Sequence, residues 1–125
     1  MKLIRPTDDE LNSAFAEKVC NWSKGDDGYG YETVYSERVA PYKTVGPVSK
    51  FNFARSADAV LPWLEKCYME TDWLGGPVRH YTDAGGGACW RVRLPGKFEG
   101  EVEDNSFPRA CVIALLRAHG VEVET

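Results

Sequence analysis

The sequence predicts an α+β domain in which three helices pack, sandwich-like, on a small antiparallel sheet. Three segments repeat apolar residues at intervals of three and four, which indicates helices. Alternating segments follow one another along the chain without helices between them, which favours a meander of three to four strands. The 125 residues suit a single domain, 1–125, with a loop-rich insertion at about 25–52.

We expect the first helix over residues 8–21. Thr7 and Glu10 have the spacing of a capping box, and Asp8 and Asp9 add negative charge where the helix dipole favours it. The positions that then follow helical spacing are Leu11, Ala14, Phe15, Lys18, Val19 and Trp22.

The insertion has three parts. Residues 23–28 are polar and rich in turn formers, which predicts a loop. Residues 29–39 are aromatic and partly alternating, which fits a strand or an irregular extended segment. Residues 40–52 contain two prolines and a glycine, and neither a helix nor a central strand tolerates that density. We therefore expect a long surface connection there.

The second helix is predicted over 57–69, after Ser56 as its cap. Pro62 lies inside the helical pattern, so either the helix kinks there or the preceding turn is a separate piece. The last helix is predicted over 107–119, and Gly120 is a suitable residue to follow its end. Because that helix is apolar on nearly every side, it should be the core element.

Three strands are predicted between these helices, over 77–82, 88–94 and 98–104, and the tail at 121–124 alternates like an edge strand. A three-residue turn at Pro95–Lys97 would pair the last two of these strands so that apolar residues lie opposite apolar residues and charged residues opposite charged residues.

In that register Val92 faces Gly100, and Arg91 faces Glu101. A two-residue turn would instead place Arg93 opposite Phe98.

Charge and composition exclude several classes of protein. The net charge of −4 and the pI of about 5.2 argue against generic binding to nucleic acid, which needs a dense cationic surface. No apolar run approaches the length of a membrane span. Residues 1–6 lack the apolar core of a secretion signal, so we expect a soluble protein of the cytosol.

The cysteines and acidic residues indicate neither a metal site nor an active site. The four cysteines are far apart and have apolar neighbours, which predicts reduced, buried thiols. Glu99, Glu101 and Glu103 fit a solvated sheet face, and the glycines at 85–87 precede a strand, whereas a phosphate loop opens a helix. We therefore expect no catalytic residues, no metal and no cofactor.

A group of aromatic and basic residues is the candidate binding surface. Four tyrosines in an irregular segment suggest contact with a partner, since rings give large contact area at low entropy cost. An arginine nearby could pair with a phosphate or a carboxylate. The candidates are Tyr29, Tyr31, Tyr35, Arg38, Tyr42, Arg79 and His80. The alternatives are that the tyrosines belong to the core and that His80 is an ordinary strand residue.

Taken together, three pieces of the sequence resemble a known family. They are residues 10–19 with Trp22 shortly after, the strand at 89–92, and the helix start at 106–116 after an acidic strand. This combination resembles the phage ABA sandwich domain family, small proteins of phages and prophages. The resemblance implies a phage origin, an α+β sandwich and no assigned activity, and it carries no catalytic residues. The insertion is where this chain departs most from the family.

These observations favour a non-enzymatic phage accessory protein that binds a target in the host cytoplasm. The target would be a host or bacterial defence protein, or a small nucleotide that is sequestered. The alternatives are a small enzyme with scattered catalytic residues and a minor structural or assembly protein. A homo-oligomer is compatible with the sequence.

Overall fold

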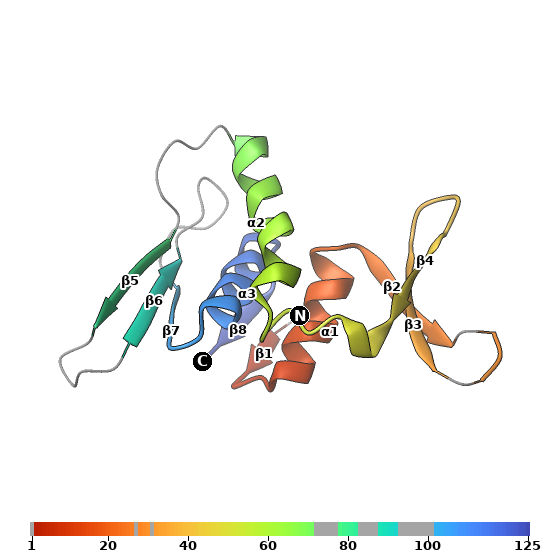
Figure 1. Ribbon diagram of the computed structural model, residues 1–125, viewed down its shortest axis with the longest axis horizontal. Helices are drawn as coiled ribbons and strands as arrows, with labels where there is room; N and C mark the ends of the chain where they lie inside the picture. The colour runs from red at the N-terminus through yellow and green to blue at the C-terminus, as the bar shows by residue number, and fades with distance from the viewer. Residues whose placement is uncertain (1, 27, 31, 72–77, 83–87, 93–101) are drawn as a thin grey trace.

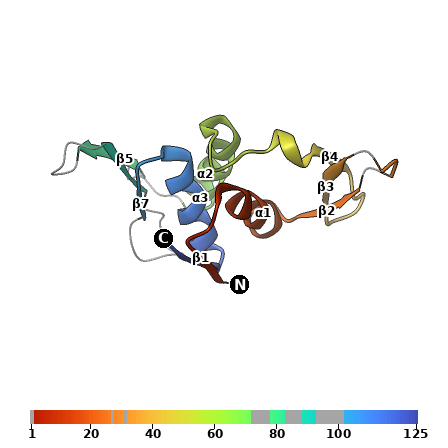
Figure 2. The ribbon, with the colours of Figure 1, turned by 90° about the horizontal axis from the view of Figure 1, so that it is seen from below.

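The structure is a computed structural model, and it describes residues 2–26, 28–30, 32–71, 78–82, 88–92 and 102–125. Three α-helices lie at the centre of the molecule, with a three-stranded sheet on either side of them (Figures 1 and 2). The helices are α1 (Asp8–Lys18), α2 (Ala57–Thr71) and α3 (Phe107–Ala118). The predicted α+β class is confirmed.

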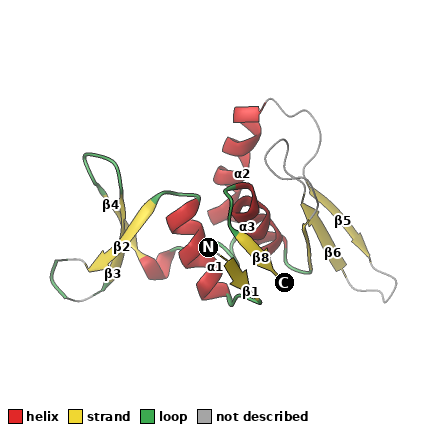
Figure 3. Ribbon diagram, turned by 180° about the vertical axis from the view of Figure 1, so that it is seen from behind, coloured by secondary structure: helices red, strands yellow, loops and turns green. Residues whose placement is uncertain are grey.

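The described strands form three sheets, where the sequence predicted one meander. One antiparallel sheet has the order β2-β3-β4 and a second has the order β5-β6-β7. A parallel pair joins β1 to β8 near the two ends of the chain (Figure 3). Their bounds are β1 (Lys2–Ile4), β2 (Trp22–Asp26), β3 (Thr33–Glu37), β4 (Thr44–Pro47), β5 (Val78–Thr82), β6 (Ala88–Val92), β7 (Val102–Asp104) and β8 (Glu122–Glu124).

Helix α3 is the centre of the hydrophobic core, as predicted. Every residue from Ala110 to Leu116 is buried, and the helix contacts both other helices and strands β6, β7 and β8. Ser106 caps it by accepting a hydrogen bond from the Arg109 backbone at 3.5 Å. None of the helices in the described part of the chain has the length and apolar character needed to cross a membrane.

Helix α1 begins at the predicted capping box and ends earlier than predicted. The Thr7 hydroxyl accepts from the Glu10 backbone at 3.2 Å, and the Glu10 carboxylate accepts from the Thr7 backbone at 3.3 Å. The helix ends at Lys18 instead of residue 21. Asn21 adopts φ 58°, a left-handed conformation that turns the chain into β2.

The insertion is more regular than predicted. Residues 23–26, expected to lie in a loop, form β2 together with Trp22, and the strand pairs with β3 in register from Trp22–Glu37 to Asp26–Thr33. The surface connection expected over 40–52 contains β4 and a 3₁₀ turn at Val48–Lys50. Because β4 is an edge strand and Pro47 is its last residue, the proline costs the sheet little hydrogen bonding.

The register of β6 and β7 differs from the predicted one by two residues. Val92 lies opposite Val102, and Arg91 lies opposite Glu103, with 2.9 Å between Nε and Oε1. A shift of two residues keeps every side chain on its predicted face, so polarity alone cannot exclude it. The predicted turn at Pro95–Lys97 and the pair Arg93–Phe98 lie outside the described residues.

The remaining elements agree with the sequence in part. Helix α2 continues through Pro62 as one helix, so the alternative of a separate first turn is wrong. The C-terminal tail forms β8, as predicted, and its partner β1 was not predicted from the sequence. The Arg5 backbone extends this pairing by donating to the Glu124 carbonyl at 2.7 Å.

Candidate functional site

A pocket of about 400 Å³ lies between α1, the β2-β3-β4 sheet and the segment after β4. It is the candidate functional site, because its lining combines charged, amide, hydroxyl and aromatic groups. The lining residues are Asp9, Asn12, Ser13, Lys24, Tyr35, Val48, Ser49, Phe51 and Asn52.

One face of α1 supplies the first wall of the pocket. Asp9, Asn12 and Ser13 are three and four residues apart, so they lie side by side on that face. The buried Asn12 donates from Nδ2 to Asn52 Oδ1 at 2.9 Å and accepts from the Ala54 backbone at 2.8 Å. These two bonds hold the segment after β4 against the helix and so fix the pocket's width.

Aromatic rings supply the second wall. The Tyr35 ring lies 5.7 Å from the Phe51 ring, at 66°, and 5.6 Å from the Trp22 ring. Phe53 continues this group into the core, where its ring lies 4.5 Å from that of Phe15. The rings are thus packed on one another, which gives the pocket a rigid apolar side.

The Tyr35 hydroxyl is a buried polar group with no hydrogen-bond partner among the residues that the structure describes, and its residue is only 2% exposed. Burial raises the pKa of Tyr35, the nearby Cys20 adds to the rise, and the neighbouring Ser13 hydroxyl partly opposes it. The side chain therefore stays a protonated donor at neutral pH. An unpartnered buried hydroxyl is costly, and in a native structure it calls for an explanation, such as a bound ligand or a bound water.

Two charged residues of opposite sign also line the pocket. The exposed Lys24 donates from Nζ to Ser13 Oγ at 3.0 Å. Asp9 lies one helical turn before Ser13, and its carboxylate interacts electrostatically with Arg55. The pocket can thus offer a cationic donor and an anionic acceptor to the same ligand.

The predicted tyrosines do not lie together. Tyr29 is 82% exposed and Tyr42 is 66% exposed, but Tyr29 lies in the loop before β3 and Tyr42 in the loop after it. Tyr35 lies in the core between them and lines the pocket, whereas Tyr31 lies outside the described residues. Arg38 is exposed and pairs with Glu17 at 3.6 Å.

The remaining predicted residues, Arg79 and His80, lie on β5, and their side chains are outside the described part. Strand β5 is on the other side of the helices from the tyrosine-bearing sheet (Figures 1 and 2). Ser13, Lys24 and Asn52 were not among the site residues predicted from the sequence. The one signal for them was a polar Asn12 at a helical core position.

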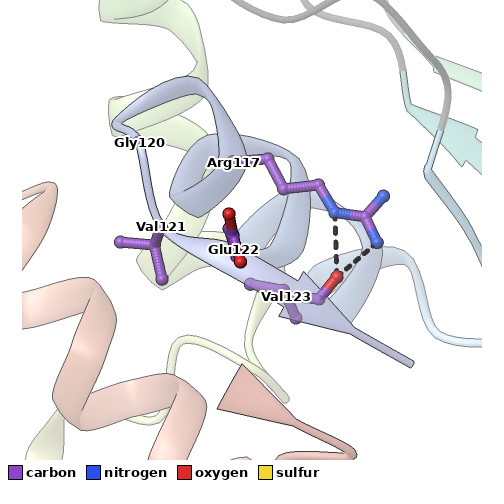
Figure 4. A pocket seen from close by; sticks show the side chains of 5 residues that line it. All are labelled: Arg117, Gly120, Val121, Glu122 and Val123. Carbon is purple, nitrogen blue, oxygen red and sulfur yellow. Dashed lines mark hydrogen bonds between the residues drawn. The ribbon is translucent and has the colours of Figure 1, made fainter. Parts of the chain in front are cut away.

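A second pocket, of about 340 Å³, lies where α3 meets β8 (Figure 4). Its cationic group, Arg117, donates from Nε and Nη2 to the Val123 carbonyl at 3.2 and 2.6 Å. These bonds tie the end of α3 to the C-terminal strand, which is a structural role.

The fold and the first pocket define an α+β protein with a cavity of small-molecule size. No family model and no curated protein matches the chain. Among solved structures, it is similar to the 2.0 Å crystal structure of a phage protein from Bacillus cereus ATCC 14579. The TM-score is 0.54 at 17% sequence identity, over 95% of this chain and 93% of that one. At this identity the similarity is one of fold.

Proposed function

We propose that the chain is a phage accessory protein, of the ABA sandwich kind, that binds a small nucleotide in the host cytoplasm without transforming it. The observation that carries the proposal is the Tyr35 hydroxyl, buried in the wall of the pocket and unpartnered. The phage origin is supported by the similarity of fold to the Bacillus cereus phage protein.

The composition of the pocket supports a nucleotide. A volume of about 400 Å³ is within the usual range for small-ligand sites. Phe51 and Val48 offer an apolar wall for a planar base, and Asn52 offers an amide for its polar edge. A ligand that reached the Tyr35 hydroxyl would supply the hydrogen bond that the protein lacks.

Binding without catalysis is supported by the state of Ser13, the pocket residue best suited to act as a nucleophile. Its Oγ is bonded to Lys24, and a lysine that takes the proton of a serine nucleophile is a buried one, whereas Lys24 is exposed. The alternative of a small enzyme predicts that the bound molecule is altered, which the experiment below would detect.

The test is to recover the protein from infected cells and to identify co-purified small molecules by mass spectrometry. We expect a nucleotide with the wild-type chain and none with Tyr35→Phe, which removes only the hydroxyl. The matched control is Tyr42→Phe, because Tyr42 is exposed and away from the pocket. Equal recovery with both variants, or recovery of a hydrolysed product, would contradict the proposal.

A second candidate function, inhibition of a host or bacterial defence protein, is favoured by a different observation. Val39 and Tyr42 are 65% and 66% exposed, and both lie in the turn after β3, where Tyr42 adopts φ 58°. Exposed apolar side chains on a turn suit contact with a protein. Replacing both with serine should abolish capture of a defence protein while leaving nucleotide recovery unchanged.

A further inference from the structure

The polar groups of the pocket indicate how much negative charge its ligand carries, and what we infer from them rests on the proposed function. The Tyr35 hydroxyl, Ser13 and Lys24 adjoin one another: Lys24 Nζ is 3.0 Å from Ser13 Oγ, and the Ser13 hydroxyl neighbours that of Tyr35. These residues come from three elements, β3, α1 and β2, and they meet at one part of the pocket wall.

All three groups can donate to the same ligand atom. Burial keeps the Tyr35 phenol protonated, so it donates. Because Ser13 Oγ already accepts from Lys24, its own hydrogen can be donated either to the neighbouring Tyr35 oxygen or to a ligand. An ammonium group has three donors and no acceptor, so Lys24 can serve Ser13 and a ligand at once. Three donors, one of them cationic, fit an anionic oxygen.

Asp9 sets the upper limit on that negative charge. It lies four residues before Ser13 on the same face of α1, and its carboxylate lines the same pocket. Lys24 is the single cation among the described lining residues, so the lining carries no net charge. A ligand with two negative charges would leave one of them uncompensated beside Asp9, and such repulsion is a common basis of selectivity.

We infer that the pocket selects a monoanion whose opposite end donates hydrogen bonds, which among nucleotides means a phosphodiester in preference to a phosphomonoester. The single negative charge lies against Tyr35, Ser13 and Lys24, and the donating end, such as an amino-bearing base, faces Asp9. A neutral nucleoside lacks the anionic phosphate that Lys24 would attract. A phosphomonoester carries about twice the negative charge that Lys24 can balance.

Three probes that share one base test this inference: adenosine, 3′,5′-cyclic AMP and AMP, which carry increasing negative charge. Each is titrated into the full chain by calorimetry near pH 7. We expect cyclic AMP to bind about tenfold or more tightly than either of the others, the size of effect typical of one charge-assisted contact. Equal affinity for adenosine and cyclic AMP, or tighter binding of AMP, would overturn the inference and leave the proposed function standing.

Two substitutions separate the roles of the charged residues. Lys24→Ala should reduce the affinity for cyclic AMP to about that for adenosine, and Asp9→Asn should improve AMP binding by about threefold or more. Lys43→Ala and Asp58→Asn are the matched controls, because both residues are exposed and neither lines the pocket. If none of the three probes binds the wild-type chain, the nucleotide proposal fails and this inference fails with it.

Discussion

The Arg109 guanidinium donates from Nη1 to Oδ1 of Asp8 at 2.7 Å, although the two residues are 101 positions apart. The same arginine donates to the Pro6 carbonyl at 2.9 Å, and Arg55 donates to the other Asp8 oxygen at 2.6 Å. The first turns of α1 and α3 are thus joined through one carboxylate that is about three-quarters buried.

This network makes part of the stability dependent on pH. The hydrogen bond from Arg55 lowers the pKa of Asp8 most, burial acts against it, and Arg109 lowers the pKa further. A carboxyl whose pKa is lower in the folded state stabilises the fold above its unfolded pKa. That stabilisation is lost as the pH falls through the folded pKa, below about pH 4.

We expect Asp8→Asn to reduce the free energy of unfolding at neutral pH by about 1–2 kcal/mol, because it removes the negative charge and replaces one of the two acceptor oxygens by an NH2 donor. The loss should shrink as the pH falls below about 4, as the wild-type carboxyl becomes protonated. Urea denaturation over that range measures both effects. The control, Asp58→Asn, changes an exposed acid in the first turn of α2. A loss for Asp8→Asn that stayed constant with pH would show that its charge is not the cause.

Asn12 is expected to be the most sensitive polar residue of the pocket. Asn12→Ala removes two hydrogen bonds and leaves the Ala54 backbone amide, itself buried, without an acceptor. The expected loss is about 2–3 kcal/mol in the free energy of unfolding. Asn52→Ala is the matched control, because it removes the exposed partner of the Asn12–Asn52 hydrogen bond and leaves the bond to Ala54 in place. It should cost about 1 kcal/mol or less. Equal losses would indicate that the bond to Ala54 contributes nothing.

A substitution at Leu115 tests whether α3 is the central element of the hydrophobic core. Its side chain is fully buried, so Leu115→Ala should lower the free energy of unfolding by about 2–5 kcal/mol. Ile4→Ala removes a similar side chain that is 63% exposed and should cost well under about 1 kcal/mol. Chemical denaturation of both variants checks this, and an unchanged midpoint for Leu115→Ala would exclude α3 as the core element.

The buried thiols should react slowly with alkylating agents. Cys20 and Cys111 are free and buried, and burial raises the pKa of both, that of Cys111 to about 12. Because the thiolate is the reactive form, peptides that contain either residue should remain unmodified by iodoacetamide near pH 8 until urea is added. Rapid labelling of the native protein would contradict this. The side chains of Cys67 and Cys89 are outside the described part, so their burial stays a prediction.

Local signals predicted the helices well, because each helix start depends on neighbouring residues. Thr7 and Glu10 form their capping box in the structure, and the continuous apolar run of α3 fills the core. Strand β2 was missed because polar residues and Gly25 have little strand propensity, and only its pairing with β3 makes it a strand. The register of β6 and β7 was missed because a shift of two residues preserves the alternation.

The pocket could be predicted only in part from the sequence. Tyr35 was among the candidate residues, but as a member of an exposed tyrosine surface. Alternation placed it on the same face as Tyr29, and nothing local distinguishes a buried ring from an exposed one. Ser13 and Lys24 meet only because β2 lies alongside α1, a tertiary contact that no spacing reports.

Replacing Tyr35 by phenylalanine should change stability and ligand binding in opposite directions. Tyr35→Phe removes a hydroxyl that has no hydrogen-bond partner in the described part of the chain, and it keeps the ring contacts with Trp22 and Phe51. Relieving a buried, unpartnered polar group should raise the free energy of unfolding by about 1 kcal/mol. The same variant should lose ligand binding, because it lacks the hydroxyl that would donate a hydrogen bond to the ligand.

Tyr35→Ala is the contrasting variant, since it also removes the ring. We expect it to lower the free energy of unfolding by about 3–5 kcal/mol, the usual cost of deleting a buried aromatic side chain. Thermal melts and urea denaturation, run beside calorimetric titration of the ligand, measure both variants. If Tyr35→Phe is less stable than the wild type, the hydroxyl has a structural partner in solution. Its place in a ligand site would then have no physical basis.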